Sequence, residues 1–122
     1  QITDFAAAPG TERQFSFSPD ENRIAFTDKT DDRTDIWIMP ANGGERRRLT
    51  DDKNEEFRPR WHADGRRILY GVERENDSQI GLAFTDGRAP VQVTRGDGDY
   101  NLLDVSADGT KIIYFSYEDV SD

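Results

Sequence analysis

The residue with the widest chemical repertoire in this sequence is His62, its single histidine. A Ser-His-Asp triad would have to use His62 as its general base. Positions 44 residues away on either side hold Ser18 and Ser106, so His62 falls where short polar side chains hydrogen-bond the local backbone. We therefore interpret His62 as a structural residue at the start of a turn. One histidine and no cysteine also argue against a zinc site, and no thiol nucleophile is present.

Carboxylates are the second group that could do chemistry, because clustered oxygens bind hard cations. Calcium needs about six to eight oxygen ligands that converge on one point. No acidic loop has the twelve-residue calcium-binding spacing with its glycine and terminal glutamate. The favoured interpretation is solvated loop charge, with bound calcium as the alternative. The acidic loops are Asp28, Asp31 and Asp32; Asp51, Asp52, Glu55 and Glu56; and Asp97 and Asp99.

Three aspartates at equal spacing, Asp20, Asp64 and Asp108, look at first like repeated catalytic carboxylates. Each stands in a sequence typical of a tight turn, and two are followed by glycine, at Gly65 and Gly109. An aspartate side chain in a turn accepts hydrogen bonds from backbone amides two residues on. We assign these five residues to repeated structural turns. The sequence therefore predicts no catalytic residue, no metal ligand and no cofactor.

Basic and adhesive motifs are also explained by local structure. The arginine run 46–48 falls in an expected strand, where successive side chains point to opposite faces and form no continuous patch. The tripeptide Arg95-Gly96-Asp97 has the sequence of a cell-adhesion motif, but it lies in a linker where turn chemistry already favours glycine and aspartate. The net charge of −9 argues against binding nucleic acid. No apolar run approaches the roughly 18–20 residues of a membrane span.

The elements that must position these residues form an internal repeat of 44 residues. A fixed period of roughly 40–45 residues indicates β-propeller blades, each of four antiparallel strands. We expect an all-β chain, 1–122, that is a single β-propeller segment. Residues 1–3 would end a preceding blade, 14–50 and 58–94 would each form a blade, and 102–117 would form the first half of a third.

Strand patterns support this division. In the second unit, strands are expected at 58–61, 67–72, 79–83 and 91–94, and at most one helical turn is expected, at 4–8. Apolar residues fall on both faces of the strand 67–72, which indicates a sheet covered on both sides, as a blade is by its neighbours. The residues predicted to pack between blades are Ile24, Phe26, Ile36, Trp37, Trp61, Ile68, Tyr70, Ile112 and Tyr114.

Four motifs of the first unit now form a recognisable set: Phe17-Ser18-Pro19-Asp20, Asp35-Ile36-Trp37-Ile38-Met39, Gly43-Gly44 and Arg48-Leu49-Thr50. Together they resemble the WD-like repeat of TolB-type β-propellers, and the resemblance covers essentially the whole chain. Two departures stand out. Glu21 replaces the turn glycine, which leaves open which residue takes the positive φ, with Asn22 as one candidate. The segment 79–81 has lost the aspartate and the aromatic residue.

The resemblance implies a non-enzymatic interaction module that recognises a protein, in a periplasmic or extracellular setting or in a cytoplasmic sensor. The alternative is the non-catalytic gating propeller of a prolyl-oligopeptidase-type serine peptidase, whose hydrolase domain lies elsewhere. No Gly-x-Ser-x-Gly elbow occurs in this sequence. About two and a half blades cannot close a ring. The chain is therefore expected to be a fragment of a longer propeller, or to complete the ring as a homo-oligomer.

Overall fold

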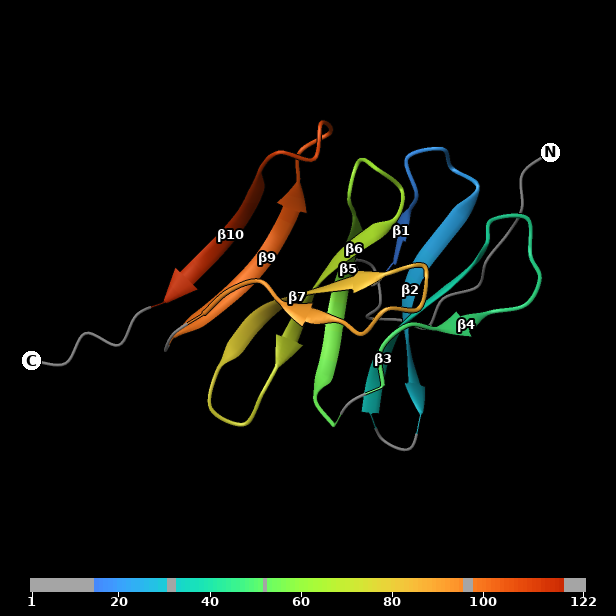
Figure 1. Cartoon of the computed structure of the whole chain (residues 1–122). Helices are drawn as coiled ribbons and strands as arrows, with labels where there is room; N and C mark the ends of the chain where they lie inside the picture. Colours follow the sequence, from blue (N-terminus) through green and yellow to red (C-terminus); the bar gives the residue numbers. More distant parts are fainter. Residues whose placement is uncertain (1–14, 31–32, 52, 96–97, 118–122) are drawn as a thin grey trace, which may run out of the picture.

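The computed structural model describes residues 15–30, 33–51, 53–95 and 98–117, and these form ten β-strands (Figure 1). The first blade contains β1 (Phe15–Phe17), β2 (Arg23–Thr30), β3 (Arg33–Pro40) and β4 (Arg47–Arg48). The second blade contains β5 (Glu55–Trp61), β6 (Arg67–Glu73), β7 (Ser78–Phe84) and β8 (Val91–Gln92). A C-terminal hairpin contains β9 (Asp99–Val105) and β10 (Ile112–Tyr117).

Each blade is an antiparallel meander whose strands pair in chain order, and the hairpin repeats the first half of a blade. The all-β, blade-like fold class is therefore confirmed. The outer strands β4 and β8 are shorter than expected, at two residues each. The expected helical turn at 4–8 and the strand end at 1–3 lie outside the described residues.

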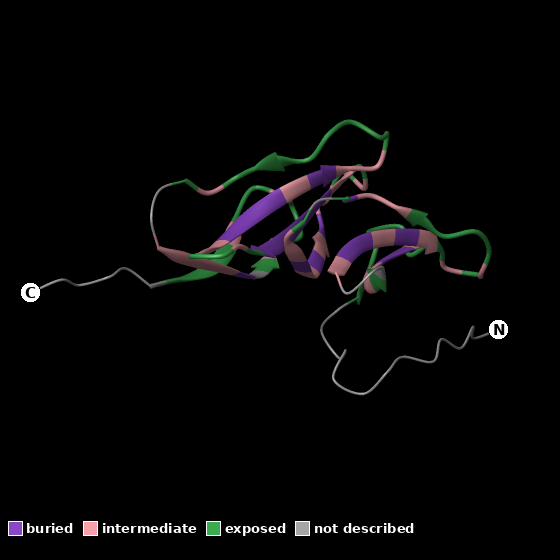
Figure 2. Ribbon diagram, turned by 90° about the horizontal axis from the view of Figure 1, so that it is seen from below, coloured by how far each residue is buried: buried purple, intermediate pink, exposed green. Residues whose placement is uncertain are grey.

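The core lies where the sheets face one another, as the buried segments in Figure 2 show. Ile36 and Ile38 of the first blade pack with Ile68 and Tyr70 of the second. On the opposite face of the second blade, Leu69 and Ile80 pack with Leu102 of the hairpin, together with Leu82, Tyr100, Val105 and Ile112. Five consecutive residues of β6 are buried, so this strand is covered on both sides, as its sequence predicts.

The interpretation of Glu56 as solvated loop charge is wrong. β5 begins at Glu55, three residues earlier than expected, and Glu56 pairs in register with Val72. Glu56 is 0% exposed as a result. Asp28 and Asp99 also belong to strands, β2 and β9. Asp51 is exposed, as expected, and the acidic positions 31, 32, 52 and 97 lie outside the described residues.

In the turn between the first two strands of each unit, Oδ1 of the aspartate accepts a hydrogen bond from the backbone amide two residues on. In the first blade, the Oδ1 atom of Asp20 accepts hydrogen bonds from Ser18 Oγ at 2.7 Å and from the Asn22 amide at 2.9 Å. Glu21 itself takes the positive φ, at 62°, and the candidate Asn22 does not. Gly65 and Gly109 take the same position, at 67° and 73°. The reason is the turn type, which fixes the residue after the aspartate as the left-handed one.

This turn predicts an acid-sensitive contribution to stability. The Ser106 hydroxyl and the Thr110 amide bond the Asp108 carboxylate and lower its pKa from 3.8 to about 2. A depressed pKa in the folded state means that the stabilisation is present above about pH 4 and is lost as the pH falls towards 2. The free energy of unfolding of Asp108→Asn should therefore be lower than that of the parent near neutral pH. It should also fall less steeply between about pH 4 and pH 2, which we call the acid limb of the stability profile. Urea unfolding at stepped pH measures this.

The control for that experiment is Glu75→Gln, which removes an exposed carboxylate from the loop between β6 and β7. Its acid limb should follow that of the parent chain. An unchanged acid limb in Asp108→Asn would contradict the role given to this turn.

Side-chain contacts also join neighbouring units. The indole nitrogen of Trp61 donates to the Ser16 carbonyl at 2.9 Å. The guanidinium of Arg23 lies 4.8 Å from the Trp61 ring centroid and donates to the Gly65 carbonyl. Arg58 reaches the hairpin by donating to the Leu102 carbonyl at 3.0 Å. Each sheet is therefore fixed to the next by side-chain bonds to backbone as well as by apolar packing.

Candidate functional site: a groove beside the outer strand of the second blade

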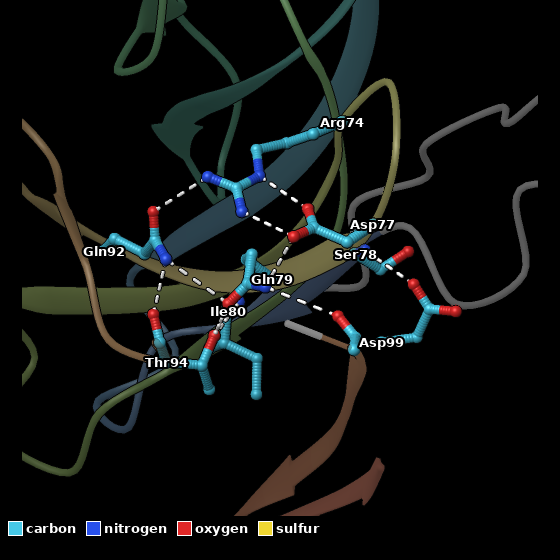
Figure 3. Close-up of polar contacts among 9 residues, drawn as sticks. Arg74, Asp77, Ser78, Gln79, Ile80, Gln92, Thr94 and Asp99 are labelled. Atoms are coloured by element: carbon cyan, nitrogen blue, oxygen red, sulfur yellow. Dashed lines mark hydrogen bonds and ion pairs between the residues drawn. The ribbon is translucent and has the colours of Figure 1, made fainter. Parts of the chain in front are cut away.

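A polar network at one end of the second blade joins the turn between β6 and β7 to the outer strand β8. Arg74 binds Asp77 through two hydrogen bonds of 2.7 Å each, from Nε and Nη2, as Figure 3 shows. Its third nitrogen, Nη1, donates to the side-chain oxygen of Gln92 on β8 at 3.2 Å. This bidentate pair fixes the guanidinium plane relative to the blade. Hydrogen bonding to Asp77 also raises the pKa of Arg74 and lowers that of Asp77.

Gln79 lies at the centre of this network and is 1% exposed. Its side-chain oxygen accepts hydrogen bonds from Thr94 Oγ1 at 2.6 Å and from the side-chain nitrogen of Gln92 at 3.3 Å. Its side-chain nitrogen donates to Asp77 Oδ2 at 3.1 Å and to the Gly98 carbonyl at 3.4 Å. A buried amide that is bonded at both ends costs little free energy and holds its neighbours in place.

Both blades contain an equivalent hydrogen bond from a backbone amide to a threonine hydroxyl. The Ile36 amide donates to Thr50 Oγ1 at 2.9 Å, and 44 residues later the Ile80 amide donates to Thr94 Oγ1 at the same distance. A threonine in the segment after the outer strand thus replaces one backbone ladder bond in both blades. The two blades share a scaffold, and their differences can be compared position by position.

The principal difference is a change of charge. In the first blade the fully buried Asp35 faces Arg48, with Oδ2 and Nη1 3.6 Å apart. The equivalent positions in the second blade hold Gln79 and Gln92, so an ion pair is replaced by a neutral amide pair. A buried carboxylate requires a cation nearby, whereas an amide pair does not. The second blade therefore has a neutral polar wall at this place.

The second difference is the lost aromatic residue. Trp37 of the first blade packs beneath Arg46, whose guanidinium lies 4.3 Å from the ring centroid. The equivalent residue in the second blade is Gly81. A Cβ atom built on Gly81 would lie only 2.6 Å from Cζ of Tyr70. The Tyr70 ring therefore lies across β7 and occupies the space next to the glycine backbone.

These two differences leave a groove of about 160 Å³ beside β8, which we call the blade-two groove. It is open on one side and has apolar and neutral polar walls, with the Arg74–Asp77 pair at its end. Its lining residues are Asn54, Tyr70, Val72, Arg74, Gln79, Gly81, Pro90, Val91 and Gln92. The lining contains no cysteine, serine, histidine or carboxylate.

Comparison with known proteins identifies the scaffold. The TolB β-propeller domain family matches residues 1–121. This chain belongs to that family. A solved structure titled putative TolB, from Agrobacterium tumefaciens, superposes on this TolB-type chain with a TM-score of 0.75 at 28% sequence identity. The match covers 87% of this chain and 39% of that structure.

Two curated relatives carry different names. Dipeptidyl-peptidase 5 of Porphyromonas endodontalis is 29% identical over 106 residues, which is 82% of this chain and 15% of that protein. The Tol-Pal system protein TolB of Anaeromyxobacter dehalogenans is 44% identical over 45 residues, or 37% of this chain and 10% of that protein. This TolB-type chain therefore spans a small part of the length of these relatives, and its blades are similar both to TolB proteins and to a peptidase.

The structure places His62 at the start of the turn between β5 and β6 of the second TolB-type blade, where its ring contacts residues of that turn. Its Nδ1 atom accepts a hydrogen bond from the Asp64 amide at 3.0 Å, and its Nε2 atom lies 3.1 Å from Arg67 Nη2. A Cβ atom built on Gly109 would lie 2.6 Å from the His62 ring, so the hairpin turn packs directly against it. Burial of Asp64 opposes its ionisation, but hydrogen bonds from Arg66 and Arg67 outweigh this and lower the pKa of Asp64.

The residues predicted to pack between blades have three kinds of surroundings. Ile24, Ile36, Trp61, Ile68 and Tyr70 are buried, whereas Phe26, Trp37 and Ile112 are partly exposed. Tyr114 is 45% exposed, with its ring 5.8 Å from that of Tyr100.

Within the described ranges, no three or more His, Cys, Asp or Glu residues are grouped so that they could hold a metal ion. In the same ranges, no helix is long and apolar enough to cross a membrane.

Sequence reasoning missed the residues of the blade-two groove. A signal was present, because Gln79 and Gly81 depart from the TolB-type pattern and Gln92 replaces the repeat-equivalent Arg48. Each departure alone resembles the ordinary divergence of repeats. Taken together, they fall on one face of adjacent strands, since Tyr70, Gly81 and Gln92 are direct cross-strand neighbours.

Proposed function

We propose that this chain is a non-catalytic recognition segment of a TolB-type β-propeller and that its partner is a protein. The observation that carries the proposal is the blade-two groove. It is large enough for a side chain, and it is built on strands that a buried hydrogen-bond network holds in place. Rigid scaffolds that present shallow, partly apolar sites favour recognition of other chains.

The repeated polar residues have structural roles in this proposal. Asp20, Asp64 and Asp108 hold the turns between the first two strands of each unit, and Gly65 and Gly109 supply the left-handed backbone. No catalytic step, metal or cofactor is assigned to them. The setting that fits the resemblance to TolB is periplasmic or extracellular.

The segment division is also a proposal: 1–3 as the end of a preceding blade, 14–50 and 58–94 as blades, and 102–117 as the first half of a third. Its support is the apolar surface at both ends of the stack. Phe15 and Phe17 are 44% and 54% exposed at one end, and Ile113 and Phe115 are 62% and 57% exposed at the other. Further blades of a longer polypeptide would cover both ends, and a second copy of the chain is the alternative.

A second candidate function is that of the gating propeller of a serine peptidase. It is favoured by the similarity to dipeptidyl-peptidase 5, which extends over 82% of this chain. In this alternative the catalytic residues lie on a hydrolase domain elsewhere in a longer polypeptide. This chain would again be catalytically silent, so the two candidates differ in what the propeller serves.

Selection from a displayed library of random peptides tests the proposed function. The immobilised chain should retain a family of peptides that share a sequence pattern, and soluble synthetic copies should bind in calorimetry. The control is a chain with the groove filled by Pro90→Trp together with Val91→Trp, used to sort the retained peptides by site. A selection that yields no shared pattern and no measurable binding would contradict recognition of a polypeptide.

A further inference from the structure

We propose that the blade-two groove receives one uncharged aromatic side chain, of phenylalanine or tyrosine type, from the partner polypeptide. This inference rests on the proposed function and names the chemistry that this site would recognise. It is carried by the size of the groove, by the comparison with the first blade, and by the state of Arg74.

The size of the groove fits one aromatic ring. Its volume is about 160 Å³. An apolar cavity of about 150 Å³ is known to bind benzene, which is the ring of phenylalanine without its attachment. Because the groove is open on one side, the backbone that carries the ring can remain outside the protein. A whole peptide cannot enter, so the groove would serve as an anchor for a single side chain.

The first blade shows which group belongs at this place. There the space beside the outer strand is filled from within by Trp37, with Arg46 over the ring at 4.3 Å and Arg48 at 5.9 Å. The repeat-equivalent residues of the second blade are Gly81, Pro90 and Gln92. The second blade has therefore lost both the ring and the two cations that cover it. Tyr70 refills only the part of the space next to Gly81.

The charges around the groove favour an uncharged guest. Arg74 is neutralised by the two hydrogen bonds to Asp77, so it offers no free cation to a carboxylate or phosphate. Gln79 and Gln92 bond each other and their neighbours, and the lining has no acidic residue for a lysine or arginine guest. A charged side chain would be desolvated there without a counter-ion.

The orientation of Arg74 favours a planar guest. All three of its nitrogens donate along the edge of the guanidinium, which fixes the plane and leaves the contact with a guest to its flat face. Guanidinium faces stack on aromatic rings. Guanidinium groups lie over aromatic rings elsewhere in this chain, at Arg23 over Trp61 and at Arg88 over Phe84, with distances to the ring centroid of 4.8 Å and 4.2 Å.

A titration followed by amide NMR tests the inference, with N-acetyl-tyrosinamide as the probe and N-acetyl-leucinamide as the comparison. The tyrosine probe should give saturable shifts at the amides of Gly81 and Gln92, with a dissociation constant of order 1 mM, as expected for so small a ligand. The leucine compound should bind at least about threefold more weakly, a difference of about 0.65 kcal/mol at 1.4 kcal/mol per tenfold.

Matched variants locate the binding. Pro90→Trp adds a ring at a lining residue and should weaken the tyrosine probe about tenfold, whereas Ala89→Trp adds the same ring at the adjacent residue, which does not line the groove, and should change affinity less than twofold. Arg74→Lys keeps the positive charge but removes the plane and should weaken the probe about threefold. Unchanged shifts of the Trp61 indole NH report that each variant is folded.

Three results would overturn the inference: no saturable shift at Gly81 and Gln92, equal binding of the two compounds, or equal effects of Pro90→Trp and Ala89→Trp. The peptide selection separates this inference from the proposed function. Selected peptides that bind the Pro90→Trp variant as well as the parent would overturn the groove assignment and leave recognition intact. Probe binding in the groove without any selected peptide would support the groove and contradict protein recognition.

Discussion

Replacing Trp61 by alanine should lower the free energy of unfolding by about 3–5 kcal/mol. Trp61 is 7% exposed and belongs to the apolar cluster that joins the two blades. Its indole nitrogen also bonds the Ser16 carbonyl, and its ring lies under the guanidinium of Arg23. The substitution removes packing, a hydrogen bond and a cation–π contact at one place. Urea unfolding monitored by circular dichroism measures the loss.

Trp37→Ala is the matched control, because it deletes the same side chain from a partly exposed site. Trp37 contacts Arg46 and Arg48 at the edge of the first blade. We expect this variant to lose about 1 kcal/mol, the scale of an exposed cation–π contact with some apolar packing. Equal losses in the two variants would show that Trp61 does not join the blades.

Replacing Gly81 by tryptophan should destabilise the chain by about 3 kcal/mol, the upper part of the range for overpacked sites. The repeat alone suggests the opposite, because the equivalent residue of the first blade is Trp37. The structure explains the difference. A Cβ atom at position 81 would lie 2.6 Å from the Tyr70 ring, and Tyr70 is 2% exposed and packs in the apolar cluster that joins the blades. Thermal and urea unfolding measure the effect.

A double-mutant cycle with Tyr70→Ala isolates this clash. In the Tyr70→Ala background, Gly81→Trp should cost at least about 1 kcal/mol less than in the parent chain, because the two residues are in contact and couple. If Gly81→Trp stabilises the parent chain, the structure does not require glycine at this position, and the glycine is only a divergence of this repeat from the others. The same result would weaken the case for the groove.

The fold was predictable from the sequence because its determinants are local. The turn motif around Asp64 and Gly65 and the apolar alternation of β6 are repeated at a constant interval, so each copy supports the others. The propeller fold and the TolB-type resemblance are confirmed on these grounds. The positive φ of Glu21 was left open between residues, because a turn type cannot be read from residue identities once the usual glycine is absent.

The groove was not predictable, because its determinants are long-range. Glu56 resembles a residue of an acidic loop, and only the extended pairing of β5 with β6 shows that it is buried. In the sequence, Gly81 looks like ordinary divergence of one repeat from the others. Only the position of the Tyr70 ring shows what space remains beside it. The neutral pair of Gln79 and Gln92 has meaning only once the two strands are known to be neighbours.

The most direct test of the account is to incubate a selected peptide with stoichiometric chain for several hours and to measure binding by calorimetry and peptide integrity by mass spectrometry in the same sample. The account predicts a bound peptide of unchanged mass, with binding weakened in the Pro90→Trp variant. Cleaved peptide, with cleavage abolished by His62→Ala, would contradict it, because His62 would then be a catalytic residue and the chain an enzyme.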